Sequence, residues 1–269
     1  MTQQQAIRVP ILAMIIFLVA ALFARSFLQL RLQNLGYNPG FAKDLSFLVV
    51  PPILAVLMYP IFREHKDHLS SLFQRQLLSW RLVLAALAVG LLMRIAWWCQ
   101  LIVRISFGIT KNADPEAIVG PSFSFNCPPG PVIVLGVFVM AMLVPVIEEV
   151  TDRGLIQSSL VHRGKSQAIM ISALVFAAFH PPASYPLTFV AGVILGIQFW
   201  NSGTLWFSVI THATYNGLIQ LDWRCINGTW NPLASDLPLY APGTVGLVGL
   251  ILSVAGIGYL IRENRAGAR

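Results

Sequence analysis

Long stretches without Asp, Glu, Lys or Arg are the feature that most constrains how this chain folds. Three of them cover residues 117–147, 166–221 and 237–261. The middle stretch is 56 residues long, whereas a helix needs about 20 apolar residues to cross a bilayer. It therefore predicts two or three membrane spans joined by tight turns. Charged residues make up only 11% of the chain, against about 25% in soluble domains, which is too few to coat a water-soluble globule.

We expect an all-α fold, a polytopic membrane helix bundle with about eight transmembrane helices. Gly, Pro and Asn clusters divide the apolar runs at positions typical of turns. No internal repeat and no linker between soluble domains is evident. The expected spans are residues 7–24, 45–62, 82–103, 131–163, 167–180, 187–200, 204–221 and 243–261.

The basic residues predict how these spans are oriented. They lie between the apolar runs rather than on one segment, so the net charge of +7 indicates a membrane rather than a nucleic-acid partner. With the N-terminus inside, eleven Lys and Arg lie in cytoplasmic segments and six in outer ones, which favours cytoplasmic termini. Cys127 and Cys225 then share the outer side, where a disulfide and two free thiols are both compatible with the sequence.

Four charged residues interrupt the expected span 131–163: Glu148, Glu149, Asp152 and Arg153. The apolar pattern continues beyond them, so the glutamates lie about 14 residues, or roughly 21 Å, from the cytoplasmic end of the helix. Ionised groups at that depth cost several kcal/mol and usually mark a functional site. The alternative is a helix that ends at the glutamates, which would then form a hydrated cap.

Helical spacing separates these charges into two pairs. Glu149 and Arg153 are four residues apart, which is a favourable ion pair on one helix face. Glu148 and Asp152 have the same spacing but like charges, and two carboxylates in a low dielectric should not both be ionised. A carboxyl group poised in this way suits general acid or base catalysis.

Two further spans place polar residues at a comparable depth. His180 follows Phe176 by one helical turn and lies roughly 21 Å from the cytoplasmic side. His212 and Asn216 share a helix face at roughly 14 and 20 Å. Taken singly, His180 could equally be a helix cap. His212 and Asn216 could equally form a polar contact between helices. The agreement in depth across three spans favours one common site.

Two carboxylates, two imidazoles and an amide at one depth predict a water-filled hydrolytic site. A carboxylate would deprotonate a water that attacks a peptide carbonyl, while His212 and Asn216 would stabilise the oxyanion. Alternatively, Glu148, His180 and His212 would hold Zn²⁺ or another divalent metal with one position left for water. We favour the scheme without a cofactor, and the sequence contains no HExxH motif.

These motifs resemble those of the CPBP intramembrane endopeptidases, which include CAAX prenyl proteases and bacteriocin-processing or immunity proteins of the Abi-like group. The family carries EExxxR, FxxxH and HxxxN motifs on successive membrane helices. They correspond here to Glu148–Arg153, Phe176–His180 and His212–Asn216. The resemblance covers residues 131–221. Asp152 is a departure, because many members have an aromatic residue before the motif arginine.

The resemblance implies an eight-helix protease that cleaves near the C-terminus or membrane segment of its substrate. It implies that Glu148 activates water, supported by Glu149 and Arg153, and that His180 positions the water. It also implies that His212 and Asn216 form the oxyanion side. Whether the mechanism is glutamate-type or metal-dependent stays open, as does a specialisation in processing C-terminal sorting tails.

The expected organisation follows from this resemblance. Residues 1–125 would hold three spans and an outer loop, and residues 126–269 the catalytic core with the C-terminal helix. The expected partners are a membrane-presented protein or peptide and the lipid bilayer, with no nucleic acid, in a bacterial inner membrane. The alternative functions are a non-catalytic immunity or scaffold protein and a proton-coupled transporter. The absence of paired broken helices weighs against the transporter.

Overall fold

The computed structural model describes residues 7–74, 78–108, 130–220 and 242–266, and every regular element within these ranges is a helix. Cys127 and Cys225, for which the sequence left a disulfide and two free thiols open, lie outside the described residues, as does the expected domain boundary at residue 125. In chain order the elements are α1 (Ile11–Asn34), α2 (Pro39–Phe47), α3 (Val50–Leu57), α4 (Tyr59–Glu64), α5 (Lys66–Leu72), α6 (Trp80–Ser106), α8 (Gly130–Gly136), the π-helix η2 (Val137–Leu143), α9 (Val144–Glu149), the π-helix η3 (Val150–Gln157), the 3₁₀-helix η4 (Val161–Arg163), α10 (Lys165–Ala178), the 3₁₀-helix η5 (Pro182–Ser184), α11 (Tyr185–Ser202), α12 (Leu205–Gln220) and α15 (Gly243–Ala266).

The prediction of a polytopic helical membrane protein is confirmed. Helices α10, α11 and α12 lie at the expected spans 167–180, 187–200 and 204–221. Each of the eight apolar runs predicted from the sequence therefore contains helix. Among the described residues, five helical segments are long and apolar enough to cross a membrane: Ile11–Asn34, Pro39–Leu57, Trp80–Arg104, Gly130–Gln157 and Gly243–Glu263.

The N-terminal spans differ from the predicted boundaries. The first helix continues to Asn34 instead of ending near residue 24. Its polar continuation is stabilised because the Arg25 guanidinium lies 3.9 Å from the centre of the Phe47 ring and donates to Gln29. The second span begins earlier than predicted, at Pro39, where the Asn38 side chain accepts hydrogen bonds from the first-turn backbone.

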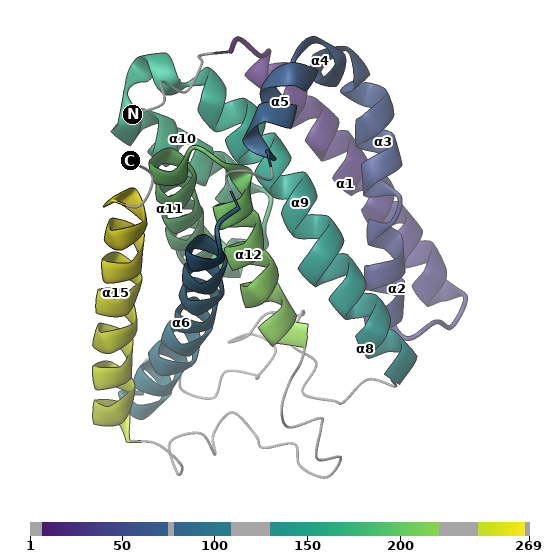
Figure 1. Cartoon of the computed structure of the whole chain (residues 1–269). Coiled ribbons are helices and arrows are strands. Elements are labelled where there is room, and N and C mark those ends of the chain that lie inside the picture. The colour runs from purple at the N-terminus through teal and green to yellow at the C-terminus, as the bar shows by residue number, and fades with distance from the viewer. Residues whose placement is uncertain (1–6, 75–77, 109–129, 221–241, 267–269) are drawn as a thin grey trace.

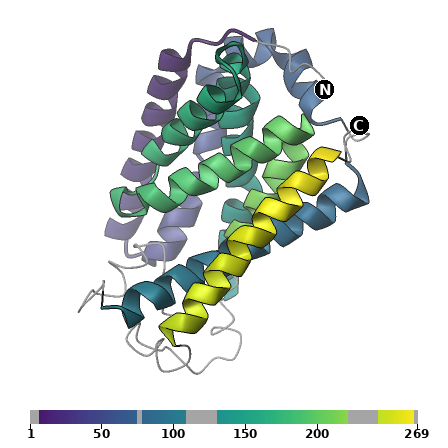
Figure 2. The same ribbon diagram turned by 90° about the vertical axis from the view of Figure 1, so that its left-hand side faces the viewer.

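Helices α6 and α15 form a long antiparallel pair on one side of the bundle (Figures 1 and 2). Glycines of α15 make this close approach possible. A methyl group built on Gly249 would lie 2.6 Å from Sγ of Cys99, and one on Gly256 would lie 3.0 Å from Leu92. Small residues are a common way to bring membrane helices together.

The run from α8 to η3 lies between α12 and the N-terminal helices α1 to α3 (Figure 1). Helix α12 contacts both α6 and this run, while α10 and α11 pack against each other beside it. The beginning of α1 and the end of α15 point toward the same end of the bundle (Figure 1). This arrangement places the charged residues of α9 and η3 beside α11 and α12.

Candidate functional site

The two glutamates end α9, and the chain continues as a π-helix to Gln157. The alternative in which the helix stops at the glutamates is therefore wrong. A second π-helix, η2, precedes α9. The paired glutamates thus end a six-residue α-helix between two π-helical stretches, and such stretches are frequent at functional sites.

Pro145 explains how Asn216 is held. The N–H of Val144 donates to the Val139 carbonyl, five residues back. Pro145 has no N–H, so it cannot continue this π pattern to the Met140 carbonyl. Nδ2 of Asn216 donates to that carbonyl instead, at 2.9 Å. One N–H of Asn216, the predicted oxyanion residue, therefore docks α12 onto η2, and the amide retains a second N–H.

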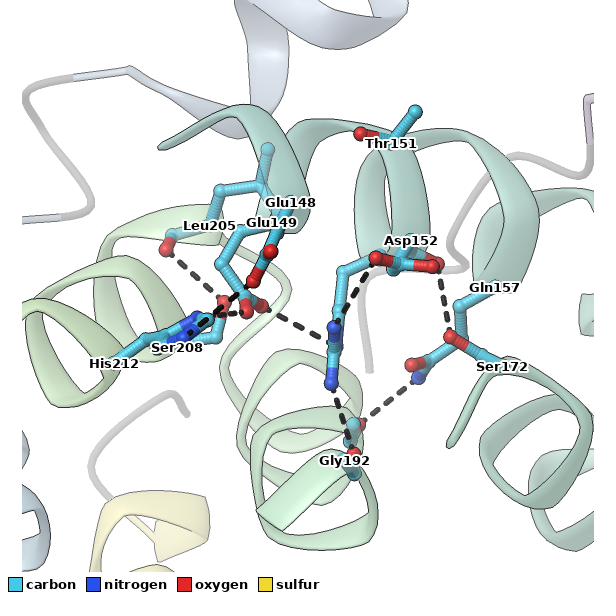
Figure 3. Close-up of polar contacts among 12 residues, drawn as sticks. Glu148, Glu149, Thr151, Asp152, Gln157, Ser172, Gly192, Leu205, Ser208 and His212 are labelled. Atoms are coloured by element: carbon cyan, nitrogen blue, oxygen red, sulfur yellow. Dashed lines mark hydrogen bonds and ion pairs between the residues drawn. The ribbon is translucent and has the colours of Figure 1, made fainter. Parts of the chain in front are cut away.

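Glu149 is fully buried and has a cation on one side and an imidazole on the other (Figure 3). Its Oε2 lies 3.3 Å from Nε of Arg153, which confirms the predicted ion pair. Arg153 is fully buried as well, and its Nη2 donates to the Gly192 carbonyl on α11 at 3.1 Å. A buried carboxylate needs such partners, because unpaired burial of its charge costs several kcal/mol.

His212 lies between the two glutamates. Its Nδ1 is 2.9 Å from Oε1 of Glu149, and its Nε2 is 3.6 Å from Oε2 of Glu148. An ionised carboxylate only accepts hydrogen bonds, so the Glu149 contact assigns the proton to Nδ1. The two carboxylates differ in access, because the Glu148 side chain is 28% exposed and the Glu149 side chain is 0% exposed. Sequence spacing predicted that His212 shares a helix face with Asn216. The structure shows that its ring contacts the two glutamates.

Phe176 connects three site residues. The centre of its ring lies 4.7 Å from that of His180, 5.7 Å from that of His212 and 4.6 Å from the Arg153 guanidinium carbon. Nδ1 of His180 is 2.9 Å from the Phe176 carbonyl oxygen, so His180 caps the end of α10. The helix-cap interpretation of His180 is confirmed. Its ring is tilted by 51° against the Phe176 ring, and its role in the common site stays a prediction.

Asp152 lies on the arginine side of the cluster. Its Oδ2 is 3.8 Å from Nη1 of Arg153, and its Oδ1 has no hydrogen-bond partner among the described residues. The Ser172 hydroxyl of α10 donates to the Asp152 backbone carbonyl at 2.9 Å. The Arg153 guanidinium therefore lies within 3.8 Å of two buried carboxyl groups, those of Glu149 and Asp152.

Gln157 and His68 were missed in the sequence. Nε2 of Gln157 donates to the Gly196 carbonyl on α11 at 2.9 Å. Two signals were present: a polar residue one turn beyond Arg153, and a G-x-x-x-G pattern from Gly192 to Gly196, which brings membrane helices together. Nε2 of His68, on α5, is 3.2 Å from the Gly154 carbonyl, and burial lowers its pKa. Nothing in its local sequence indicated this contact.

The predicted metal ligands are not gathered as a set. Within the described ranges, no group of three His, Cys, Asp or Glu side chains has an arrangement that could hold a metal ion. His212 and Glu148 are neighbours, but the contact that links His180 to them is the Phe176 ring. The described donors do not fit a zinc triad, and we derive no step through a metal.

A comparison with protein-family models matches residues 130–218 to the type II CAAX prenyl endopeptidase Rce1-like family. The matched segment is about a third of the chain and includes all three motifs. The resemblance to the CPBP and CAAX proteases is thereby confirmed for this segment. Comparisons with curated proteins and with solved structures gave no match. A protease-family domain and several apolar helices together indicate an integral membrane peptidase.

Proposed function

Because residues 130–218 match a CAAX-type prenyl endopeptidase family, we propose that this protein is an intramembrane endopeptidase. It hydrolyses a peptide bond near the C-terminus or membrane segment of a membrane-presented substrate, by water activated at Glu148. One observation supports this assignment above all others. His212 separates an accessible carboxylate, Glu148, from a fully buried one, Glu149.

Glu148 is suited to act as the general base. Its side chain is exposed enough to meet water, and it has no ion pair with a Lys or Arg among the described residues. It accepts a proton from the attacking water while the water oxygen bonds to the substrate carbonyl carbon. The same proton then passes to the leaving amide nitrogen as the peptide bond breaks. General acid–base catalysis of this kind contributes about 10²–10⁴-fold.

Glu149 and Arg153 serve this step by orienting His212. The Glu149 contact holds the ring by Nδ1 and leaves Nε2 on the side of Glu148. Arg153 keeps the buried Glu149 carboxylate ionised and therefore able to accept that bond. Nε2 of His212 is thus held in place beside the reacting groups before the reaction begins. Such preorganisation of polar groups is what stabilises a transition state.

His180 and Asn216 are the remaining polar residues of the proposed site. His180 is held by its own cap and by the Phe176 ring, so its Nε2 is available to position water. Asn216 uses one N–H for the Met140 carbonyl, and its second N–H is available for the oxyanion. The same proposal places the protein in a bacterial inner membrane with both termini in the cytoplasm. It includes C-terminal sorting tails as candidate substrates.

The test is a cleavage assay on the full chain in lipid nanodiscs. Two quenched fluorogenic peptides serve as probes, a farnesylated CAAX peptide and a matched peptide that lacks the prenyl group. Glu148→Gln should accumulate normally but lose about 100-fold or more of the cleavage rate, and a zinc chelator should leave wild-type cleavage intact. Equal cleavage by wild type and Glu148→Gln would refute the proposal. Loss of cleavage with the chelator would instead show a metal-dependent mechanism.

A further inference from the structure

Arg153 and Gln157 form two parallel bonds to α11. They lie four residues apart on η3, and each donates from a fully buried side chain to a glycine carbonyl. Arg153 reaches Gly192 at 3.1 Å, and Gln157 reaches Gly196 at 2.9 Å. The acceptors are also four residues apart, so the two bonds lie on consecutive turns of each helix (Figure 3).

A side chain at either acceptor position would crowd its neighbours. A methyl group built on Gly192 would lie 3.0 Å from Cα of Ala173, and one built on Gly196 would lie 2.9 Å from Oε1 of Gln157. Glycine at these positions lets neighbouring elements approach the α11 backbone, so that side chains of η3 reach its carbonyls. The G-x-x-x-G pattern of α11 therefore serves side-chain donors as well as helix packing.

The two donors differ in what else they contact. Arg153 also pairs with Glu149, which holds His212. Among the described residues, Gln157 forms no hydrogen bond with a glutamate or a histidine of the site. Gln157 is fully buried, so it acts on the site only through the position of η3. Without the Gln157 bond, Arg153 would be the one remaining side-chain donor from η3 to α11 among the hydrogen bonds of the described residues.

We propose that Gln157 is a positioning residue of the active site. By bonding to Gly196 it fixes the register of η3 on α11, and this register keeps the Arg153 guanidinium in contact with both Gly192 and Glu149. The orientation of His212 then depends on Gln157 through Arg153 and Glu149. This inference rests on the proposed function, since the site it positions is the proposed catalytic one.

The direct test uses the histidine itself as the probe. The full chain is labelled with ¹⁵N-histidine in nanodiscs, and the His212 signals are assigned by their loss in His212→Gln. Gln157→Leu, which removes the donor at similar volume, and Gly196→Ala, which displaces the amide, should both shift the His212 Nδ1 resonance. Asn201→Ala is the matched control: its side chain accepts a bond from Lys165 between α10 and α11 at 3.2 Å. It should leave that resonance unchanged.

Cleavage of the farnesylated peptide gives the second readout. Gln157→Leu should lower kcat roughly tenfold with little change in KM, because small misplacements of a reacting group cost one to two orders of magnitude. In an Arg153→Lys background, Gln157→Leu should cause little further loss, since it acts through Arg153.

Three outcomes would overturn this inference. The first is an unchanged His212 signal in both Gln157→Leu and Gly196→Ala. The second is a kcat of the Arg153→Lys, Gln157→Leu double variant that equals the product of the two single losses. The third is a change in the His212 signal that appears only in samples whose melting temperature falls far below that of Asn201→Ala. The proposed function fails separately, if Glu148→Gln cleaves as well as wild type. Loss of cleavage in Glu148→Gln together with unchanged kcat and His212 signal in Gln157→Leu would refute only the positioning role.

Discussion

Two helix interfaces in this protein use glycine for close approach but place different chemistry in the contact. Between α6 and α15, the atoms that face Gly249 and Gly256 belong to Cys99 and Leu92. Between η3 and α11, the space at Gly196 is taken by the amide of Gln157. Both contacts hold helices together, since small residues allow dense packing in a membrane.

The difference lies in what each interface can position. An apolar contact tolerates a small shift of one helix along the other, because dispersion attraction has little directionality. A contact made of hydrogen bonds at two consecutive turns tolerates almost none, because hydrogen bonds weaken steeply with distance and angle. The directional interface is the one that carries Arg153, the partner of Glu149. Rigidity is thus concentrated where the proposed chemistry needs it.

The largest effect is expected when the buried ion pair is broken. Arg153→Leu leaves Glu149 buried without its cation, and breaking a buried pair in this way costs about 3–5 kcal/mol. We expect loss of both the folded protein and cleavage, measured by thermal unfolding in nanodiscs and by peptide hydrolysis. Arg153→Lys is the control that keeps the charge, and it should retain more stability than Arg153→Leu. Equal stability of Arg153→Leu and wild type would contradict the role of the pair.

A smaller loss is expected at the apolar interface, and it should spare catalysis. Gly249→Ala places a methyl group 2.6 Å from Sγ of Cys99, and overpacking of this kind costs about 1–3 kcal/mol. We expect a lower melting temperature with an unchanged kcat per folded molecule. Adding Cys99→Ala should restore most of the stability, because it removes the crowding sulfur. A fall in kcat at equal folded fraction would show that this interface also positions the site.

A third prediction separates docking from catalysis at Asn216. Asn216→Leu removes the donor to the Met140 carbonyl, and losing such a bond costs about 1 kcal/mol. Pro145→Ala supplies a backbone N–H close to that carbonyl, so the double variant should regain stability. Cleavage should not return with it if the second N–H of Asn216 serves the oxyanion. Recovery of both properties would assign Asn216 a docking role alone.

The smallest effect is expected at His68, where α5 contacts η3. Burial lowers the pKa of His68, so below about pH 6.5 the unfolded chain binds a proton that the folded chain resists. Stability should therefore fall as the pH drops through this range. His68→Gln keeps a donor for the Gly154 carbonyl and removes the titration, so its melting temperature should depend less on pH between 7 and 5. An identical pH dependence would contradict the assignment.

The sequence allowed much of the site to be predicted, because ionisable side chains inside apolar runs are rare. Glu149 with Arg153 follows from helical spacing, and that pair is present at 3.3 Å. The catalytic roles of Glu148, His180, His212 and Asn216 stay predictions, which the assays above test. Spacing did not predict the partner of His212, because that contact joins residues 63 positions apart.

By itself, the sequence determined that the chain is a helical membrane protein and which of its few charges lie within the spans. Both are properties of local composition, since about 20 apolar residues suffice to define a span. Only the tertiary structure decided that His212 lies between two glutamates, that Asn216 occupies the gap left by Pro145, and that Gln157 joins η3 to α11. These contacts depend on the wider π-helical turns and on helix docking, and neither is encoded in the spacing of residues along one helix.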